Sequence, residues 1–122
     1  MDQFQDRNLL IVDDEKDVLI FLSMILGKRG FKVITSHTTD CIKELLNAHP
    51  HLILLDINMP GMMGTEICDI VKHSPDKNTP VILMSGNHDI EQQAKKCGAD
   101  AWLPKPFEAA ALIKMIEGYF PA

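Results

Sequence analysis

The chain has 122 residues, a length typical of one domain with a sizeable apolar core. Its residues are 46% hydrophobic and 24% charged, as in an ordinary soluble globular protein, and no apolar run approaches the roughly 20 residues of a membrane helix. The net charge of −5, without any run of Lys or Arg, argues against direct nucleic-acid binding, and the polar N-terminus argues against a signal peptide.

Five short apolar runs alternate along the chain with segments of helical periodicity. The runs are too short for helices and too continuously apolar for half-exposed strands, which is typical of a parallel sheet covered on both faces. They occupy residues 9–12, 33–34, 52–55, 81–84 and 101–103.

Apolar stripes at helical spacing follow the five runs, at residues 18–26, 42–46, 67–71, 90–97 and 112–119. Gly98 ends the fourth stripe and is a good residue for a helix C-terminus. This fourth stripe is the weakest, because the polar segment EQQAKK runs across it. A helix anchored so lightly could shift at little cost.

A strand and a helix repeated five times predict a βα repeat with helices on both faces of one sheet. An eight-fold barrel needs roughly twice this length. We therefore expect one α/β domain over residues 1–122, with a doubly wound, flavodoxin-like (βα)5 sheet in the order 2-1-3-4-5.

Chemically active residues stand at the carboxyl ends of four of these strands. Asp13 and Asp14 follow the first strand, Asp56 follows the third, Ser85 the fourth, and Lys105 comes just after the fifth. Because ligands bind beyond the carboxyl ends of such strands, near the switch in strand order, we expect these side chains to converge on one cleft.

Three neighbouring carboxylates repel one another unless a cation is bound between them. Mg²⁺ suits an all-oxygen site of this kind. Asp56 could then act as a nucleophile toward phosphorus, while Lys105 and Ser85 stabilise the charge on the phosphoryl oxygens.

Each of these residues alone has a simpler structural interpretation. Asp13 or Asp14 could cap the first helix, and Asp56 could be a turn residue. Ser85 and Lys105 could be ordinary loop residues. Their joint occurrence at the matching strand ends is what favours a functional site.

The segments LLIVDDE, LLDINMPGMMG, VILMSG and GADAWLPKPF resemble the motifs of the receiver domain of two-component response regulators. The resemblance covers essentially the whole chain and is similar in extent to stand-alone regulators of chemotaxis and sporulation relays. It implies a phosphoryl-accepting signalling switch, with self-limited phosphotransfer and autodephosphorylation instead of metabolic turnover.

The resemblance also implies roles for single residues. Asp56 would be the phosphoacceptor, and Asp13 and Asp14 would bind Mg²⁺ or Mn²⁺ with the backbone carbonyl of Asn58. Ser85 and Lys105 would contact the phosphoryl group, and a cis bond is expected between Lys105 and Pro106.

Trp102 stands where the family usually has Tyr or Phe as a rotamer switch. Its larger ring leaves two interpretations open: a switch coupled to the strand-4 hydroxyl, or an apolar residue that fills the face of the last strand.

The implied partners are a histidine kinase or histidine phosphotransfer protein as donor and a downstream protein target. The target would bind the face made by the fourth helix, fifth strand and fifth helix. The protein would be cytoplasmic, and a monomer or a phosphorylation-dependent dimer.

Three other functions fit the sequence less well. A Mg²⁺-dependent phosphohydrolase usually has a DxD motif and a cap domain, whereas the first strand here ends in DD. A flavodoxin-like cofactor binder needs a Ser/Thr/Gly-rich phosphate loop, and the corresponding loop is acidic. A degenerate receiver that acts only as a scaffold would not need all five key residues.

The cysteines Cys41, Cys68 and Cys97 are odd in number and widely spaced. They fit neither a disulfide framework nor a CxxC site, so we expect reduced thiols.

Overall fold

The computed structural model describes residue 4 and residues 6–121. Strands and helices alternate along the described chain, as the apolar pattern predicts. In chain order they are β1 (Asn8–Val12), α1 (Lys16–Lys28), β2 (Lys32–Ser36), α2 (Ile42–Asn47), β3 (Leu52–Asp56), α3 (Gly64–Lys72), β4 (Val81–Ser85), α4 (Ile90–Cys97), β5 (Ala101–Pro104) and α5 (Ala109–Glu117).

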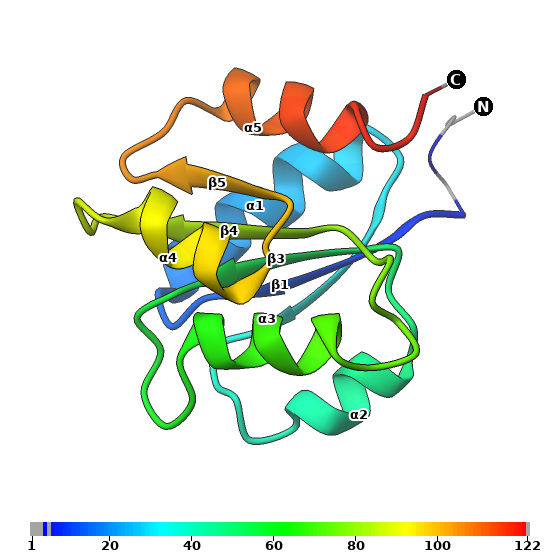
Figure 1. The fold of residues 1–122 in the computed structure, drawn as a ribbon. Coiled ribbons are helices and arrows are strands. Elements are labelled where there is room, and N and C mark those ends of the chain that lie inside the picture. Colours follow the sequence, from blue (N-terminus) through cyan, green and yellow to red (C-terminus); the bar gives the residue numbers. More distant parts are fainter. Residues whose placement is uncertain (1–3, 5, 122) are drawn as a thin grey trace.

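The strands form one five-stranded parallel sheet in the order β2-β1-β3-β4-β5 (Figure 1). Leu10 of β1 pairs with Ile34 of β2 on one side and with Ile53 of β3 on the other. The predicted doubly wound order is therefore confirmed. The switch in strand order lies between β1 and β3, which is where such sheets bind ligands.

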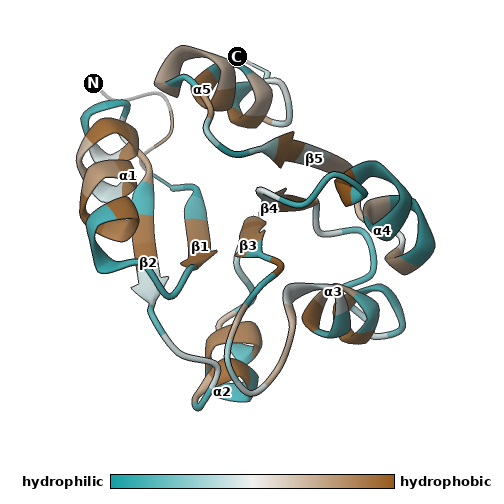
Figure 2. Ribbon diagram, turned by 90° about the vertical axis from the view of Figure 1, so that its left-hand side faces the viewer, coloured by the Kyte–Doolittle hydropathy of each residue, from teal (hydrophilic) through white to brown (hydrophobic). Residues whose placement is uncertain are grey.

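Helices cover both faces of the sheet (Figure 2). Leu9 and Ile11 of β1 join an apolar cluster with Leu22 of α1 and Ile116 of α5, whereas Leu10 joins a second cluster under α2, α3 and α4. This alternation follows from the two-residue period of a strand. Because both faces are covered, every residue of β3 and β4 is buried.

β2 differs from the prediction because it extends over five residues, Lys32–Ser36, and not two. It is an edge strand, and its side chains at Lys32 and Thr35 are exposed. Only the partly buried centre of such an edge strand is continuously apolar in sequence.

In α1 and α3, the buried residues differ in part from those of the apolar stripes in the sequence. Phe21 of α1 and Ile70 of α3 were expected to face the core, but they are 49% and 47% exposed. Leu19 and Cys68 are buried in those helices instead. The stripes contained more apolar residues than the core accommodates, so the side chains at their margins remain exposed.

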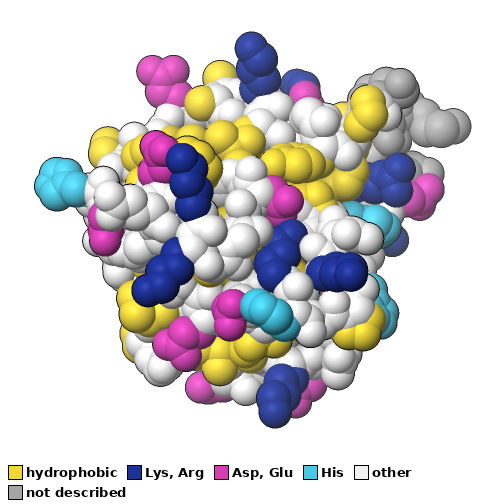
Figure 3. All heavy atoms as spheres, in the orientation of Figure 1, with side chains coloured by type: hydrophobic (Ala, Val, Ile, Leu, Met, Phe, Trp, Pro, Cys, Tyr) yellow, Lys and Arg dark blue, Asp and Glu magenta, His cyan; other side chains and the backbone are white. Residues whose placement is uncertain are grey.

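The end of α4 agrees with the sequence-based expectation of a glycine cap, and the surface of the protein agrees with a composition that contains both acidic and basic residues. Gly98 has a φ of 84° after α4, a left-handed conformation that glycine adopts readily. On the face shown in Figure 3, acidic and basic side chains are interspersed. Among the described residues, no helix is both long enough and apolar enough to cross a membrane.

Candidate functional site

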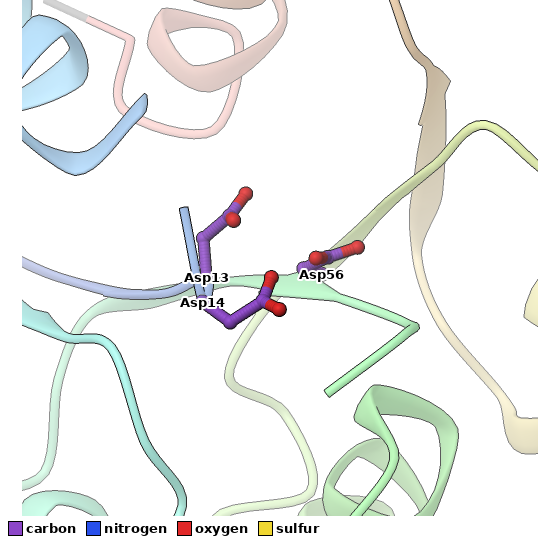
Figure 4. A group of neighbouring side chains, drawn as sticks. All are labelled: Asp13, Asp14 and Asp56. Carbon is purple, nitrogen blue, oxygen red and sulfur yellow. The ribbon is translucent and has the colours of Figure 1, made fainter. Parts of the chain in front are cut away.

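Three carboxylates meet where β1 and β3 end (Figure 4). Asp13 and Asp14 follow β1, Asp56 is the last residue of β3, and one oxygen from each lies within 4.8 Å of the others. Asp13 is fully buried, Asp56 is 5% exposed, and Asp14 faces solvent. The three carboxylates that the strand ends were predicted to bring together therefore do lie together.

Lys105 enters this cluster from the loop after β5. Its Nζ donates a hydrogen bond to Asp13 Oδ2 at 2.8 Å and lies 3.7 Å from Asp56 Oδ2 and 3.5 Å from Glu15 Oε1. The Lys105 backbone N–H donates to the Ser85 carbonyl at 2.8 Å, and the Lys105–Pro106 bond is cis, as the sequence resemblance implied. The loop thus fixes the base of this side chain while its ammonium group remains among the carboxylates.

Asp13 is held from two sides. Its Oδ2 accepts the Lys105 hydrogen bond, and its Oδ1 accepts one from the Glu15 backbone N–H at 2.9 Å. The residue that caps α1 by position is Glu15, and it makes no side-chain capping bond. The interpretation of Asp13 or Asp14 as a helix cap is therefore not supported.

Burial raises the pKa of Asp56 to about 6, and the charges of Asp13 and Asp14 act in the same direction. The charge of Lys105 and the Asn58 backbone N–H oppose this rise. Burial alone would lower the pKa of Lys105, but the hydrogen bond and charge of Asp13 outweigh it and raise that pKa. Near neutral pH, Asp56 is therefore ionised beside a charged lysine.

Ser85 lies at the end of β4 and is fully buried. Its Oγ accepts hydrogen bonds from the Asn87 backbone N–H at 3.0 Å and from Asn58 Nδ2 at 3.4 Å. The side-chain amides of Asn58 and Asn87 also bond to each other in both directions, each at 3.3 Å. This amide pair joins the loops that follow β3 and β4.

The sequence did not reveal three contributors to this site. It assigned Asn58 only a backbone carbonyl, and it assigned nothing to Asn87 or to Glu15. Asn87 stands two residues after Ser85 at a strand end, a position from which it could have been found. Glu15 continues the acidic run after β1, but its approach to Lys105 depends on the path of the loop.

Trp102 lies in β5 opposite Leu83, two residues before Pro104, which pairs with Ser85. Its ring is partly buried against the cluster under α4, and Lys95 Nζ lies 5.9 Å from the ring centroid. The structure thus places Trp102 under α4. Its movement as a switch stays a prediction.

The donor set fits a hard divalent cation. Asp13, Asp14 and Asp56 carry three negative charges, and Lys105 offsets one of them. The ligand atoms that these three side chains offer are all carboxylate oxygens, which a hard cation prefers. Burial, and to a lesser extent the negative charges of Asp13 and Asp14, raise the pKa of Asp56 at this site.

Comparison with known proteins agrees with this geometry. Residues 9–117 match the family model for the response regulator receiver domain. The chain is 32% identical to protein PilG of Pseudomonas aeruginosa, over 100% of this chain and 94% of that protein. It is 31% identical to sporulation initiation phosphotransferase F of Bacillus subtilis, over 95% of each chain. The structure of the chemotaxis response regulator CheY4 of Vibrio cholerae matches with a TM-score of 0.84 and 29% identity, over 93% of this chain and 98% of that one.

Proposed function

The chain belongs to the response regulator receiver family, which accepts phosphate in two-component signalling, and we propose that Asp56 is its phosphoacceptor. The observation that carries this proposal is the position of Asp56. It is a carboxylate at the end of a buried strand, it is ionised near neutral pH, and it lies within 3.7 Å of an ammonium group. A rigidly held nucleophile beside a cation is what transfer to a carboxylate requires.

In the proposed reaction a carboxylate oxygen of Asp56 attacks the phosphorus of a donor phosphohistidine. The new bond joins this oxygen to phosphorus, and the phosphorus–nitrogen bond breaks with its electron pair remaining on the imidazole. The product is an aspartyl phosphate and a neutral histidine once that nitrogen takes up a proton.

Asp13, Asp14, Asp56 and the backbone carbonyl of Asn58 would hold Mg²⁺ or Mn²⁺. When bound, such an ion supplies positive charge to the phosphoryl oxygens during transfer. Lys105, which is paired with Asp13, supplies a second positive charge. Ser85 has a hydroxyl that can donate a hydrogen bond to a phosphoryl oxygen.

The phosphodonor would be a histidine kinase or a histidine phosphotransfer protein. Support for its approach comes from the surface beside Lys105, where a pocket of about 510 Å³ is lined in part by Phe21, Pro106 and Phe107. Ile20 and Met24 of α1 are exposed as well, at 60% and 56%. An apolar surface next to Lys105 suits a protein donor.

The output would pass through the face made by α4, β5 and α5 to a downstream protein. α4 buries only Ile90 and Ala94, so a shift of this helix exposes little apolar surface. Phosphorylation would favour one of two positions of α4, with Ser85 and Trp102 coupling the site to it.

Phosphotransfer in this proposal is self-directed, and the aspartyl phosphate would be hydrolysed at the same site. We further propose that residues 1–122 act as one receiver domain in the cytoplasm, and that the protein is a monomer or dimerises when phosphorylated. The composition and the three free cysteines support the cytoplasmic placement.

Intact-protein mass spectrometry with a small acyl-phosphate donor tests the proposal. We expect one hydroxylamine-labile phosphoryl group that depends on Mg²⁺. It should be absent from Asp56→Asn and retained by Asp40→Asn, which changes an exposed aspartate outside the site. Equal labelling of the two variants would refute Asp56 as the acceptor.

A further inference from the structure

Two of the three cysteines meet between α3 and α4. Cys68 is fully buried within α3, and Cys97 is the partly buried last residue of α4. The Cys68 thiol donates to the Cys97 carbonyl oxygen at 3.5 Å, and the Cys97 thiol donates to the Ala94 carbonyl, also at 3.5 Å. Cys41, in contrast, is exposed just before α2.

The two thiols also affect each other. Burial raises the pKa of Cys68, and the neighbouring Cys97 side chain raises it further. The helices that carry them are packed neighbours. The Cys68 sulfur thus lies 3.5 Å from a backbone atom of Cys97, and a disulfide would require the two Cα atoms to come to about 4.4–6.8 Å of each other.

Cys97 can be reached from solvent. A groove of about 520 Å³ runs between the two helices, with Glu66 and Asp69 on the α3 side and Gln93, Lys96 and Cys97 on the α4 side. Cys68 does not line this groove. A small oxidant would therefore meet Cys97 first, with Cys68 directly behind it.

We propose that Cys68 and Cys97 form a reversible disulfide that ties the C-terminal end of α4 to α3, and that the oxidant is a low-molecular-weight disulfide such as glutathione disulfide.

The reaction proceeds by two thiol–disulfide exchanges. The Cys97 thiol loses its proton, its sulfur attacks the oxidant, and one equivalent of glutathione leaves and takes up a proton. The Cys68 thiol then loses its proton, and its sulfur attacks Cys97 Sγ and releases the second glutathione. Two thiols are oxidised by two electrons, and one glutathione disulfide is reduced to two thiols. The second exchange is the slow one, because few Cys68 thiols are ionised near neutral pH.

The consequence for signalling rests on the proposed function. Among the described residues, the hydrogen bonds of the two thiols go to Cys97 and Ala94 and not to the acceptor site, so we expect the disulfide to leave that site intact. It does join α4 covalently to α3, which restricts the helix whose shift would carry the signal. Oxidation would thus leave phosphorylation in place and suppress the response of α4.

The first test uses the full chain with Cys41→Ser, which removes the exposed thiol and puts serine at a helix N-terminal position that it favours. After incubation with glutathione disulfide, we expect the intact mass to fall by two hydrogen atoms. Peptide mapping should find Cys68 joined to Cys97, and dithiothreitol should restore the mass. A stable glutathione adduct on Cys97, a disulfide between two chains, or no reaction would each overturn the proposal.

Adding Cys97→Ser to this variant is the matched control, because Cys97 is the partly exposed member of the pair and its replacement disturbs the core little. No change in mass is expected, since Cys68 is buried. Rapid labelling of Cys68 in this control would contradict the order of reaction.

The second test compares reduced and oxidised protein by amide hydrogen exchange, before and after acyl-phosphate treatment. We expect phosphorylation in both forms, and a change in α4 exchange in the reduced form alone. An equal change in both forms would overturn the regulatory part. Failure of the reduced protein to be phosphorylated would count against the proposed function only, because disulfide mapping requires no phosphorylation.

Discussion

Lys105 lies closer to Asp13 than to Asp56 in the unphosphorylated site. Its Nζ is 2.8 Å from Asp13 Oδ2 and 3.7 Å from Asp56 Oδ2. Asp13 thus holds the lysine beside Asp56, while the Asp56 carboxylate itself stays outside hydrogen-bond distance of the ammonium group. A short movement of the ammonium group would bring it to a phosphoryl oxygen on Asp56, so the resting ion pair keeps the lysine near its proposed position of use.

Replacing Lys105 by Met should raise the pKa of Asp56 above its present value of about 6 in metal-free protein, since the lysine charge is what lowers it. The carboxyl carbon of Asp56, followed by NMR in the presence of a chelator, gives this pKa directly. Lys96→Met, which removes an exposed lysine of α4, is the control and should leave the titration unchanged. A pKa of Asp56 that is the same in all three proteins would show that Lys105 does not act on it.

Asp56→Asn should stabilise the metal-free protein at pH 7. The folded-state pKa of Asp56 is raised from 3.8 to about 6, so the folded protein binds the proton more tightly and its stability falls as the pH rises from about 4 to about 6. Asparagine cannot ionise and avoids this loss, which amounts to about 1–3 kcal/mol.

Urea unfolding of wild type and Asp56→Asn from about pH 4 to pH 7 measures the difference. The two proteins should differ most at pH 7 and converge below about pH 4, where both side chains are neutral. A variant that is less stable than wild type at pH 7 would mean that contacts of the ionised carboxylate outweigh the cost of burying it.

Adding Mg²⁺ should stabilise the folded protein by relieving the repulsion among the three carboxylates. At a concentration of about 100 times the dissociation constant, the gain in free energy of unfolding is about 2.7 kcal/mol. Asp14→Asn should lose most of this gain, and because Asp14 is exposed, its replacement should not unfold the protein. Thermal unfolding with and without the ion provides the measurement, and Asp40→Asn, with the full gain, is the control.

Most of the fold follows from the sequence, because continuous apolar runs identify buried strands and the order of βα units limits the topology. Asp13, Asp14, Asp56, Ser85 and Lys105 were placed together for the same reason, since each stands at the carboxyl end of a parallel strand. What could be predicted was therefore which residues meet at that edge of the sheet.

Side-chain contacts between loops could not be predicted in this way. The Asn58–Asn87 amide pair joins residues 29 positions apart in two loops, and the Cys68–Cys97 contact depends on how two helices pack. The inward turn of Cys68 in place of Ile70 shows the same limit: an apolar stripe indicates that a helix is buried but does not fix its rotation to within one residue.

Gly64 should be the glycine whose replacement most disturbs the acceptor loop. A Cβ at this position would overlap the backbone carbonyl of Asp56, because α3 begins directly against the end of β3. Gly64→Ala therefore forces the loop or the strand end to move. We expect it to lower the free energy of unfolding by about 1–3 kcal/mol and to slow phosphorylation by acyl phosphate.

Gly27→Ala is the matched control. No atom of the described residues lies within 4 Å of a Cβ at that position in α1, so the change should stabilise the protein by roughly 0.5–1 kcal/mol and leave phosphorylation unaltered. Equal stability and equal phosphorylation rates in the two variants would show that the close approach of α3 to Asp56 does not position the acceptor.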